Sequence, residues 1–291
     1  MCAAGALSAC SVVPSATEAF SVSGTSLSRD SFNTFVGELI GLGQVPEGDN
    51  GGSGEETRSV ATILIRQEAT NDFLAEQGQS ITAEDRASLL ATINEGDPFY
   101  SYSKKLQDSL IEINLSPVVL GRVPMPSATQ LKELYNTLPA RAGVVCMSHI
   151  VVDTREDANE VLRRLKNGEA FADVAKDASI EPAAQQTGGA LANQQDNNPC
   201  FTLSALRQAG LDADFVAGAL SARAGIPTGP VKSSFGYHII LNAPWDDVSE
   251  AVTALVQESP GAVLNEGYLY TSKISVSSSI GRWNVVTGQV E

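Results

Sequence analysis

Residues 144–152 read VVCMSHIVV, an apolar run that is typical of a β-strand. Asp153 or Thr154 can cap a helix directly after it, and Gly168 marks the end of that helix. The apolar residues between these limits recur at helical spacing: Ala158, Val161, Leu162 and Leu165. The stretch therefore predicts a strand followed by an amphipathic helix.

Further elements continue this unit. A short helix is expected over 171–178, followed by a loop at 188–189, a polar stretch at 193–199 and another helix. Residues 229–231 (GPV) and 236–241 (GYHIIL) read as two closing strands. The order β-α-α-loop-α-β-β predicts an α+β domain of about 100 residues. We place it at 143–245.

The sequence before this unit is mainly helical. We expect a strand at 18–24, helices at 31–42, 58–78 and 126–138, and a Gly-rich acidic loop at 45–57. Ser28 or Asp30 can cap the first of these helices, and Thr82 with Asp85 resembles a helix N-terminus. Helical segments continue through about residue 118.

The C-terminal residues resume this pattern. Residues 247–258 are expected as a helix, and 273–290 alternate like an edge strand. The first and last strands can pair with each other. The fold expected is α+β, with the 143–245 domain inserted into a mainly helical domain made from 18–142 and 246–291.

Charge excludes some partners. The chain has 291 residues, 19 Lys and Arg against 34 Asp and Glu, and a net charge of −15. Without a Lys/Arg cluster, such a chain is a poor candidate for binding nucleic acid through its phosphates. No stretch reaches the roughly 18 apolar residues that indicate a membrane-spanning helix. Any imidazole chemistry must use His149 and His238, the two histidines of the sequence.

The N-terminus and the cysteines bear on location. Residues 7–10 (LSAC) resemble a bacterial lipobox, in which Cys10 would carry the lipid, although an ordinary Ala/Ser-rich terminus is the alternative. We expect 1–17 to be a leader, lipobox and tether, with Cys2 in the leader. Cys146 and Cys200 then remain as an even pair, which predicts a disulfide in an oxidising compartment; two buried free thiols are the alternative.

Six short motifs occur in order at plausible spacing. They are 148–152 (SHIVV), 165–171 (LKNGEAF), 178–182 (ASIEP), 188–189 (GG), 229–231 (GPV) and 235–240 (FGYHII). Together they resemble a parvulin-type peptidyl-prolyl isomerase domain. The flanking helices and 281–284 (GRWN) look like the chaperone part of SurA-like and PrsA-like exported foldases.

The resemblance implies cis/trans isomerisation of X–Pro bonds in unfolded clients. The uncatalysed barrier is ~18–20 kcal/mol, because amide resonance must be broken. No bond to the protein and no cofactor are required. A dry pocket that fits the twisted prolyl ring lowers this barrier when its hydrogen bonds favour the rotated amide.

The resemblance also implies site residues. His149 and His238 would join one hydrogen-bond network with the Ser233 hydroxyl, and Glu181 would lie near the substrate carbonyl. Leu211 and Phe215 would line the proline pocket beside Gly188 and Gly189, whereas Met147 and Leu220 would be core. Each residue also has an interpretation without a role in catalysis. The histidines would be structural core groups, Glu181 a solvated loop acid, Gly188 and Gly189 an ordinary turn, and Leu211 and Phe215 plain core.

Some features depart from the family. The usual Gly-Gly-Asp-Leu-Gly is Gly-Gly-Ala-Leu-Ala here, with Ala190 and Ala192 in place of Asp and Gly, and the acid is Glu rather than Asp or Cys. Residues 193–202 are longer and more polar than expected. These departures favour the alternative of a holdase with a weak or inactive isomerase domain.

Other functions receive less support. Cys146 lies three residues before His149, but nothing marks the third group that would orient a base for a thiol nucleophile. The absence of CxxC spacing argues against zinc, so we expect no metal. No basic cluster suits a phosphorylated substrate. A surface lipoprotein that binds another partner remains a third hypothesis, without a ligand motif to support it. We expect an extracytoplasmic bacterial protein whose clients are unfolded, proline-containing chains, and whose contact with a membrane is through the lipid anchor alone.

Overall fold

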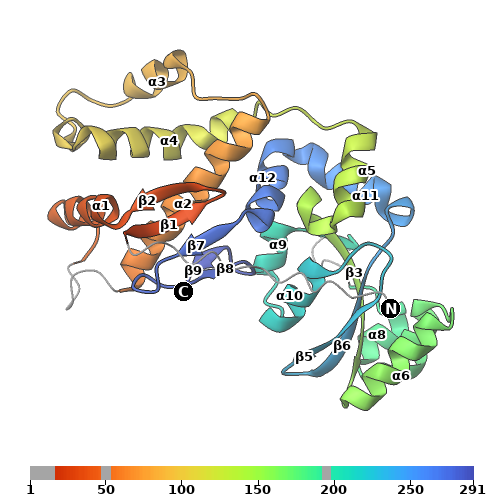
Figure 1. Cartoon of the computed structure of the whole chain (residues 1–291). Helices are drawn as coiled ribbons and strands as arrows, with labels where there is room; N and C mark the ends of the chain where they lie inside the picture. The colour runs from red at the N-terminus through yellow and green to blue at the C-terminus, as the bar shows by residue number, and fades with distance from the viewer. Residues whose placement is uncertain (1–16, 47–53, 192–197) are drawn as a thin grey trace.

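A computed structural model describes residues 17–46, 54–191 and 198–291. Its architecture is α+β, as predicted (Figure 1). The strands are β1 (Glu18–Val22), β2 (Thr25–Ser28), β3 (Val144–Val152), β4 (Cys200–Thr202), β5 (Thr228–Ser233), β6 (Gly236–Asn242), β7 (Ile274–Val276), β8 (Trp283–Asn284) and β9 (Gln289–Val290).

The helices divide into those before β3, those between β3 and β6, and those that follow. The first group is α1 (Arg29–Gly41), α2 (Glu55–Glu76), α3 (Ala83–Leu90), η1 (Pro98–Ser101), α4 (Lys104–Leu120), α5 (Ala128–Thr137) and η2 (Pro139–Ala142). The second is α6 (Arg155–Lys166), α7 (Phe171–Ala178), α8 (Pro182–Thr187), α9 (Leu203–Gln208) and α10 (Ala213–Ser221). The third is α11 (Trp245–Glu258) and α12 (Pro260–Thr271).

The two ends of the chain meet in one sheet of order β2-β1-β7, in which β1 pairs antiparallel with β7. Phe20 of β1, Phe32 of α1 and Ile65 of α2 are buried in the cluster beneath it. Apolar burial of this kind is what holds short strands in place. The predicted pairing of the N-terminal and C-terminal strands is confirmed (Figure 1).

The second sheet has the order β4-β3-β6-β5 and is antiparallel throughout. Successive side chains of β3 point to opposite faces, as strand geometry requires. Ile150 and Val152 pack against α6 and α7, whereas Val145 and Met147 pack against α9 and α10. Helices α6 and α7 therefore cover one face of this sheet, and α9 and α10 cover the other.

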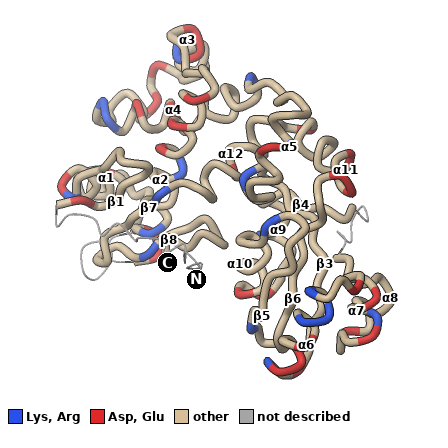
Figure 2. The backbone as a smooth tube through the Cα atoms, turned by 45° about the vertical axis from the view of Figure 1, so that its right-hand side comes forward, with Lys and Arg blue, Asp and Glu red and all other residues tan. Residues whose placement is uncertain are grey.

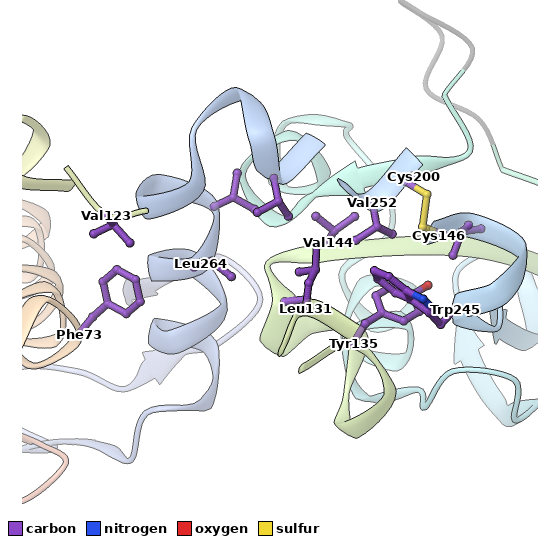
Figure 3. Close-up of a cluster of buried hydrophobic side chains, with 14 of the residues drawn as sticks. Phe73, Val123, Leu131, Tyr135, Val144, Cys146, Cys200, Trp245, Val252 and Leu264 are labelled. Atoms are coloured by element: carbon purple, nitrogen blue, oxygen red, sulfur yellow. A yellow bond between two sulfur atoms is a disulfide. The ribbon is translucent and has the colours of Figure 1, made fainter. Parts of the chain in front are cut away.

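A second core joins the β4-β3-β6-β5 sheet to the helices of both chain ends. It runs from Phe73 of α2 through Leu264 of α12 to Val144 of β3 and Trp245 of α11, as Figure 3 shows. A disulfide links Cys146 to Cys200 inside the same cluster, next to Trp245 (Figure 3). Strand β3 is thus packed at its N-terminal end against the helices contributed by both ends of the chain.

A charged contact reinforces this junction. Glu266 of α12 forms ion pairs with Arg66 of α2 and with Arg207 of α9. The Arg207 Nε–H also donates to the Val286 carbonyl at 3.1 Å. All three charged side chains are half-buried or more, at 15 to 35% exposure. One carboxylate therefore ties the β4–α9 segment to the helical part.

Some boundaries differ from the prediction. Residues 273–290 are not one edge strand: β7 ends at Val276, a turn follows, and β8 and β9 form a separate hairpin. Helix α2 begins at Glu55, inside the stretch predicted as loop. Glu55 and Glu56 lie in its first turn, where the helix dipole favours negative charge. The α+β domain expected at 143–245 also contains α8 and β4, which the sequence pattern did not indicate.

Charged side chains are spread over both parts of the molecule, with Lys and Arg scattered among Asp and Glu (Figure 2). The basic end of α6 is matched by acids, because Arg163 pairs with Glu160 and Arg164 pairs with Glu169 and Asp177. Within the described ranges, no helix is long and apolar enough to cross a membrane.

Candidate active site

Strands β3 and β6 place the two histidines side by side. In the register of this pair Val151 lies opposite His238 and His149 lies opposite Ile240, so both imidazoles project from the sheet face that α10 covers. Their Nδ1 atoms are 3.3 Å apart and their rings are nearly parallel, at 9°. Both side chains are buried.

A polar group lies at each end of this pair. Glu181, just before α8, places Oε2 2.8 Å from His149 Nε2. At the other end, Ser233 Oγ of β5 lies 2.7 Å from His238 Nε2. The backbone N–H of Phe235 donates to the same hydroxyl oxygen at 3.0 Å. The result is a continuous row Glu181–His149–His238–Ser233.

One arrangement of protons satisfies this row when both imidazoles are neutral. With its proton on Nε2, His149 makes a close electrostatic contact with the carboxylate of Glu181, short of an aligned hydrogen bond, and accepts at Nδ1 from His238 Nδ1–H. His238 Nε2 then accepts from the hydroxyl of Ser233. Every hydrogen points the same way along the row. Protonation of either ring would disturb this order, because an added N–H meets another donor.

Burial keeps the imidazoles neutral. It lowers the pKa of His149, although the nearby carboxylate of Glu181 opposes part of that shift. Burial also lowers the pKa of His238, to about 4, and the neighbouring His149 adds to the shift while Asp212 opposes it. At neutral pH the pair is therefore a fixed hydrogen-bonding unit and not a cationic site.

Three members of the row, Glu181, His149 and His238, line a cavity of about 380 Å³, and Ser233 lies behind His238. The lining of the cavity comes from β3, the loop before α8, the start of α10 and the β5–β6 turn: His149, Val151, Ile180, Glu181, Leu191, Gly210, Leu211, Asp212, Phe215, Phe235 and His238. The Phe215 ring meets both imidazoles, with centroids 5.3 Å from His149 and 5.1 Å from His238. Leu211, in the loop just before the N-cap of α10, lines the same cavity.

Asp212 sets the position of Phe215. Its Oδ1 accepts hydrogen bonds from the backbone N–H groups of Asp214 and Phe215, which caps α10 at its start. Its Oδ2 accepts from the backbone N–H and the hydroxyl of Ser234 in the β5–β6 turn, and the Ser234 hydroxyl contributes most to lowering the pKa of the Asp212 carboxyl. This carboxylate therefore ties the helix that carries Phe215 to the turn that carries Phe235.

Gly188 and Gly189 lie behind the cavity wall and not on it. A Cβ on Gly189 would come within 2.6 Å of the His149 carbonyl oxygen, and one on Gly188 within 2.7 Å of Ala172 Cβ. Both glycines have positive φ, at +67° and +86°. The His149 N–H donates to the Gly189 carbonyl at 2.8 Å. Their expected part in substrate binding is therefore indirect, since they support the backbone of His149.

The departures in the Gly-Gly loop leave this support in place. Ala190 forms an antiparallel bridge with Ser148, and Leu191 N–H donates to the Met147 carbonyl at 3.0 Å. These contacts use backbone atoms, so Ala190 makes them without an aspartate. Ala192 and the polar stretch 193–197 lie outside the described residues, as do Cys10 and the rest of the proposed leader up to residue 16.

The cysteines and core residues take no part in the cavity. Cys146 and Cys200 face each other across β3 and β4 and form the disulfide, so neither of them offers a free thiol beside His149. Met147 and Leu220 are buried in the cluster between the sheet and α10. In the part of the chain that the structure describes, no three His, Cys, Asp or Glu side chains form a group that could hold a metal ion.

Of the lining residues that the sequence analysis did not assign to the site, three bear on its chemistry and access: Ile180, Asp212 and Phe235. Asp212 has the signal of a helix cap, an Asp just before an apolar helical stretch. Phe235 stands in a Ser-Phe-Gly turn between two strands, where an aromatic residue has no structural need to be. Ile180 has no sequence signal that separates it from its neighbours.

The arrangement suits rotation about an amide bond. An apolar cavity with an aromatic floor offers room for a compact apolar ring, and a carboxylate beside a neutral imidazole pair sets a fixed electrostatic field at its edge. Residues 151–243 match the family described as a PPIC-type PPIase rotamase domain. The chain contains a parvulin-type rotamase domain. The match lies within the predicted limits of 143–245.

Two curated relatives bear the name foldase protein PrsA. The protein of Clostridium kluyveri is 39% identical over 115 residues, which cover 38% of this chain and 31% of that protein. The protein of Caldanaerobacter subterraneus is 28% identical over 145 residues, covering 48% of this chain and 44% of that protein. The matched segments thus span less than half of these relatives. The crystal structure of PrsA from Bacillus subtilis is 21% identical, with 84% of this chain and 86% of that chain covered and a TM-score of 0.31.

Proposed function

We propose that this protein is an extracytoplasmic foldase that catalyses cis/trans isomerisation of X–Pro bonds in unfolded client chains. The observation that carries the proposal is the Glu181–His149–His238–Ser233 row, whose first three members line an apolar cavity that also contains Phe215, within a rotamase domain. Catalysis is non-covalent: the cavity binds the prolyl ring, and the row favours the twisted amide over the planar one.

Each residue has a proposed part. Phe215 and Leu211 hold the ring, and the dry surroundings favour the twisted amide, which has lost its resonance. The negative charge of Glu181 disfavours the charge-separated resonance form of the substrate carbonyl, which weakens its C–N double-bond character. His149 and His238 keep Glu181 and Ser233 in place through their fixed tautomers.

Three features support the location and the clients. The Cys146–Cys200 disulfide fits an oxidising compartment. The named relatives are PrsA foldases, and residues 7–10 offer a site for a lipid anchor on Cys10. We therefore propose a cell-envelope protein, anchored through Cys10, whose partners are extended polypeptides that contain proline.

Exchange NMR on a short Ala-Pro peptide tests the activity. Wild-type protein is expected to accelerate exchange between the cis and trans forms, and Glu181→Ala to reduce kcat/KM by roughly tenfold or more. Glu156→Ala is the matched control, because Glu156 is an exposed acid on α6 away from the cavity. No acceleration by folded wild type, or equal losses in both variants, would contradict the proposal.

A holdase without isomerase activity is the second candidate, and the loss of the family aspartate at Ala190 favours it. The two candidates separate in a combined assay. A holdase suppresses aggregation of an unfolded client and leaves the Ala-Pro peptide unchanged. The foldase does both, and its Glu181→Ala variant keeps the suppression alone.

A further inference from the structure

Asp212 uses both oxygens of its carboxylate, and each oxygen binds a different element. Oδ1 accepts from the backbone N–H groups of Asp214 at 3.0 Å and Phe215 at 3.3 Å, at the start of α10. Oδ2 accepts from the backbone N–H of Ser234 at 3.2 Å and from its hydroxyl at 2.8 Å. A helix N-cap needs one side-chain oxygen, which a serine supplies equally well. The second oxygen is therefore not explained by capping.

On the helix side, the carboxylate holds the first turn of α10, which carries Phe215. Further along this helix, Gly218 packs closely against β5, where an added Cβ would come within 2.8 Å of a Val231 methyl group. Such close packing leaves the helix little freedom at that point. Asp212 supplies a second point of attachment nearer the N-terminus. Phe215 lies midway between the two points along the chain, and its ring contacts both imidazoles.

On the turn side, the carboxylate holds the residue next to the end of the row. Ser234 follows Ser233, whose hydroxyl oxygen lies 2.7 Å from His238 Nε2. The same hydroxyl oxygen accepts from Phe235 N–H at 3.0 Å, so the hydrogen bonds of the two serines together fix the β5–β6 turn. If this turn were released, the Ser233 hydroxyl would move away from His238, and the order of protons along the row would be lost.

We propose that Asp212 is a positioning residue: its bridge to Ser234 keeps the aromatic floor of the cavity in register with the Ser233 end of the row. This inference rests on the proposed isomerase function and concerns the same site. The bridge acts through geometry, by setting where the aromatic ring and the end of the row lie. A misplacement of 1 Å can reduce a rate by about 100-fold, so the loss of the bridge has a measurable effect on catalysis.

The test separates the bridge from the helix cap. Asp212→Ser keeps one oxygen for the cap of α10 and lacks the second oxygen that binds Ser234. It is expected to unfold at a temperature close to that of the wild type and to reduce kcat/KM for the Ala-Pro peptide by roughly tenfold. Ser234→Ala keeps the carboxylate and the backbone contact, so its loss is expected to be smaller. The double variant should lose no more than Asp212→Ser alone, because both changes break one bridge.

The imidazole signals in the NMR spectrum give a second readout. The sequence has two histidines, and the Phe215 ring lies 5.3 Å from one imidazole and 5.1 Å from the other. In Asp212→Ser without substrate, the signals of both imidazoles are expected to shift as the ring moves. Ser234→Ala keeps the charge of Asp212 and should shift them in the same direction by a smaller amount. A loss of stability alone would leave the signals of the folded protein in place.

Thr154→Ala is the matched control, because it removes a helix cap that has no bridge. Thr154 caps α6 by accepting from Asp157 N–H at 3.1 Å, and it does not line the cavity. Its kcat/KM and its imidazole signals should equal those of the wild type.

Two results would overturn the inference. One is an Asp212→Ser variant with the kcat/KM and imidazole signals of the wild type, which would make Asp212 a cap alone. The other is a loss in Asp212→Ser that Ser234→Ala does not share, which would indicate direct contact of the carboxylate with the substrate. If the wild type itself fails to isomerise the peptide, the proposed isomerase function fails, and the imidazole signals then decide whether Asp212 positions the cavity.

Discussion

Removal of the Cys146–Cys200 disulfide should destabilise the rotamase domain by a calculable amount. The two cysteines are 54 residues apart in sequence and both are buried. In the chain-entropy account, opening a loop of this length restores about 14 cal/mol/K to the unfolded chain, which is about 4 kcal/mol at 25 °C. The loop contains His149 and Glu181, so its stability bears directly on the site.

The perturbation is Cys146→Ala with Cys200→Ala, because alanine leaves no unsatisfied hydroxyl in the buried cluster. Trp245 packs in the same cluster and reports its unfolding by fluorescence in urea, in a Trp283→Phe background that removes the other tryptophan. The free energy of unfolding is expected to fall by about 3–4 kcal/mol. A reductant should lower the stability of the cysteine-containing protein by a similar amount.

The double variant supplies the control, since a reductant should not change its stability. A loss below about 1 kcal/mol would refute the reasoning. It would mean that the segments that pair as β3 and β4 in the native state, through Val144–Thr202 and Val145–Phe201, stay close in the unfolded chain as well, so that the covalent bond restricts it little further.

Three further outcomes follow from the contacts. The pKa of His238 is lowered from 6.5 to about 4 in the native protein, so between these values the unfolded chain takes up a proton that the native chain does not. Urea titrations should therefore show the free energy of unfolding decreasing as the pH is lowered from 6.5 to 4, and decreasing less steeply in His238→Gln. Gly189→Ala should lower the free energy of unfolding by at least about 2 kcal/mol more than Gly168→Ala, as measured by thermal unfolding. Both glycines have positive φ, but only a Cβ added at position 189 would collide with a neighbouring atom. Glu266→Ala removes the carboxylate that both Arg66 and Arg207 pair with and should cost about 1–3 kcal/mol, clearly more than the exposed Glu160→Ala; equal costs would contradict a structural role for the junction.

Local signals in the sequence were sufficient for much of the fold. Strand β3 has the predicted bounds, and Thr82 with Asp85 forms the expected capping box. These features depend on neighbouring residues alone. The C-terminal hairpin could not be predicted, because alternation over 273–290 does not distinguish one strand from two short ones. The chain turns at residues 278–280, where the Ile280 and Gly281 N–H groups donate to the Ser277 carbonyl, and there β7 and β8 separate.

Tertiary contacts account for the remaining differences. Strand β4 has three residues, too few for a periodic signal, and exists because β3 pairs with it. Within the site, the ordered motifs predicted that His149 and His238 join one hydrogen-bond network. They could not show that Asp212 binds a turn 22 residues later, or that Phe235 is left exposed, since both facts depend on how α10 meets the β5–β6 hairpin.

The central claim is that the Glu181–His149–His238–Ser233 row accelerates X–Pro rotation in client chains. The most direct measurement is the slow, proline-limited refolding phase of an unfolded client, followed with wild type and with Glu181→Ala. The account predicts that catalytic amounts of wild type increase the rate of this phase and that the variant, equally folded, does not. An unchanged rate with wild type, or the same acceleration by the variant, would contradict it.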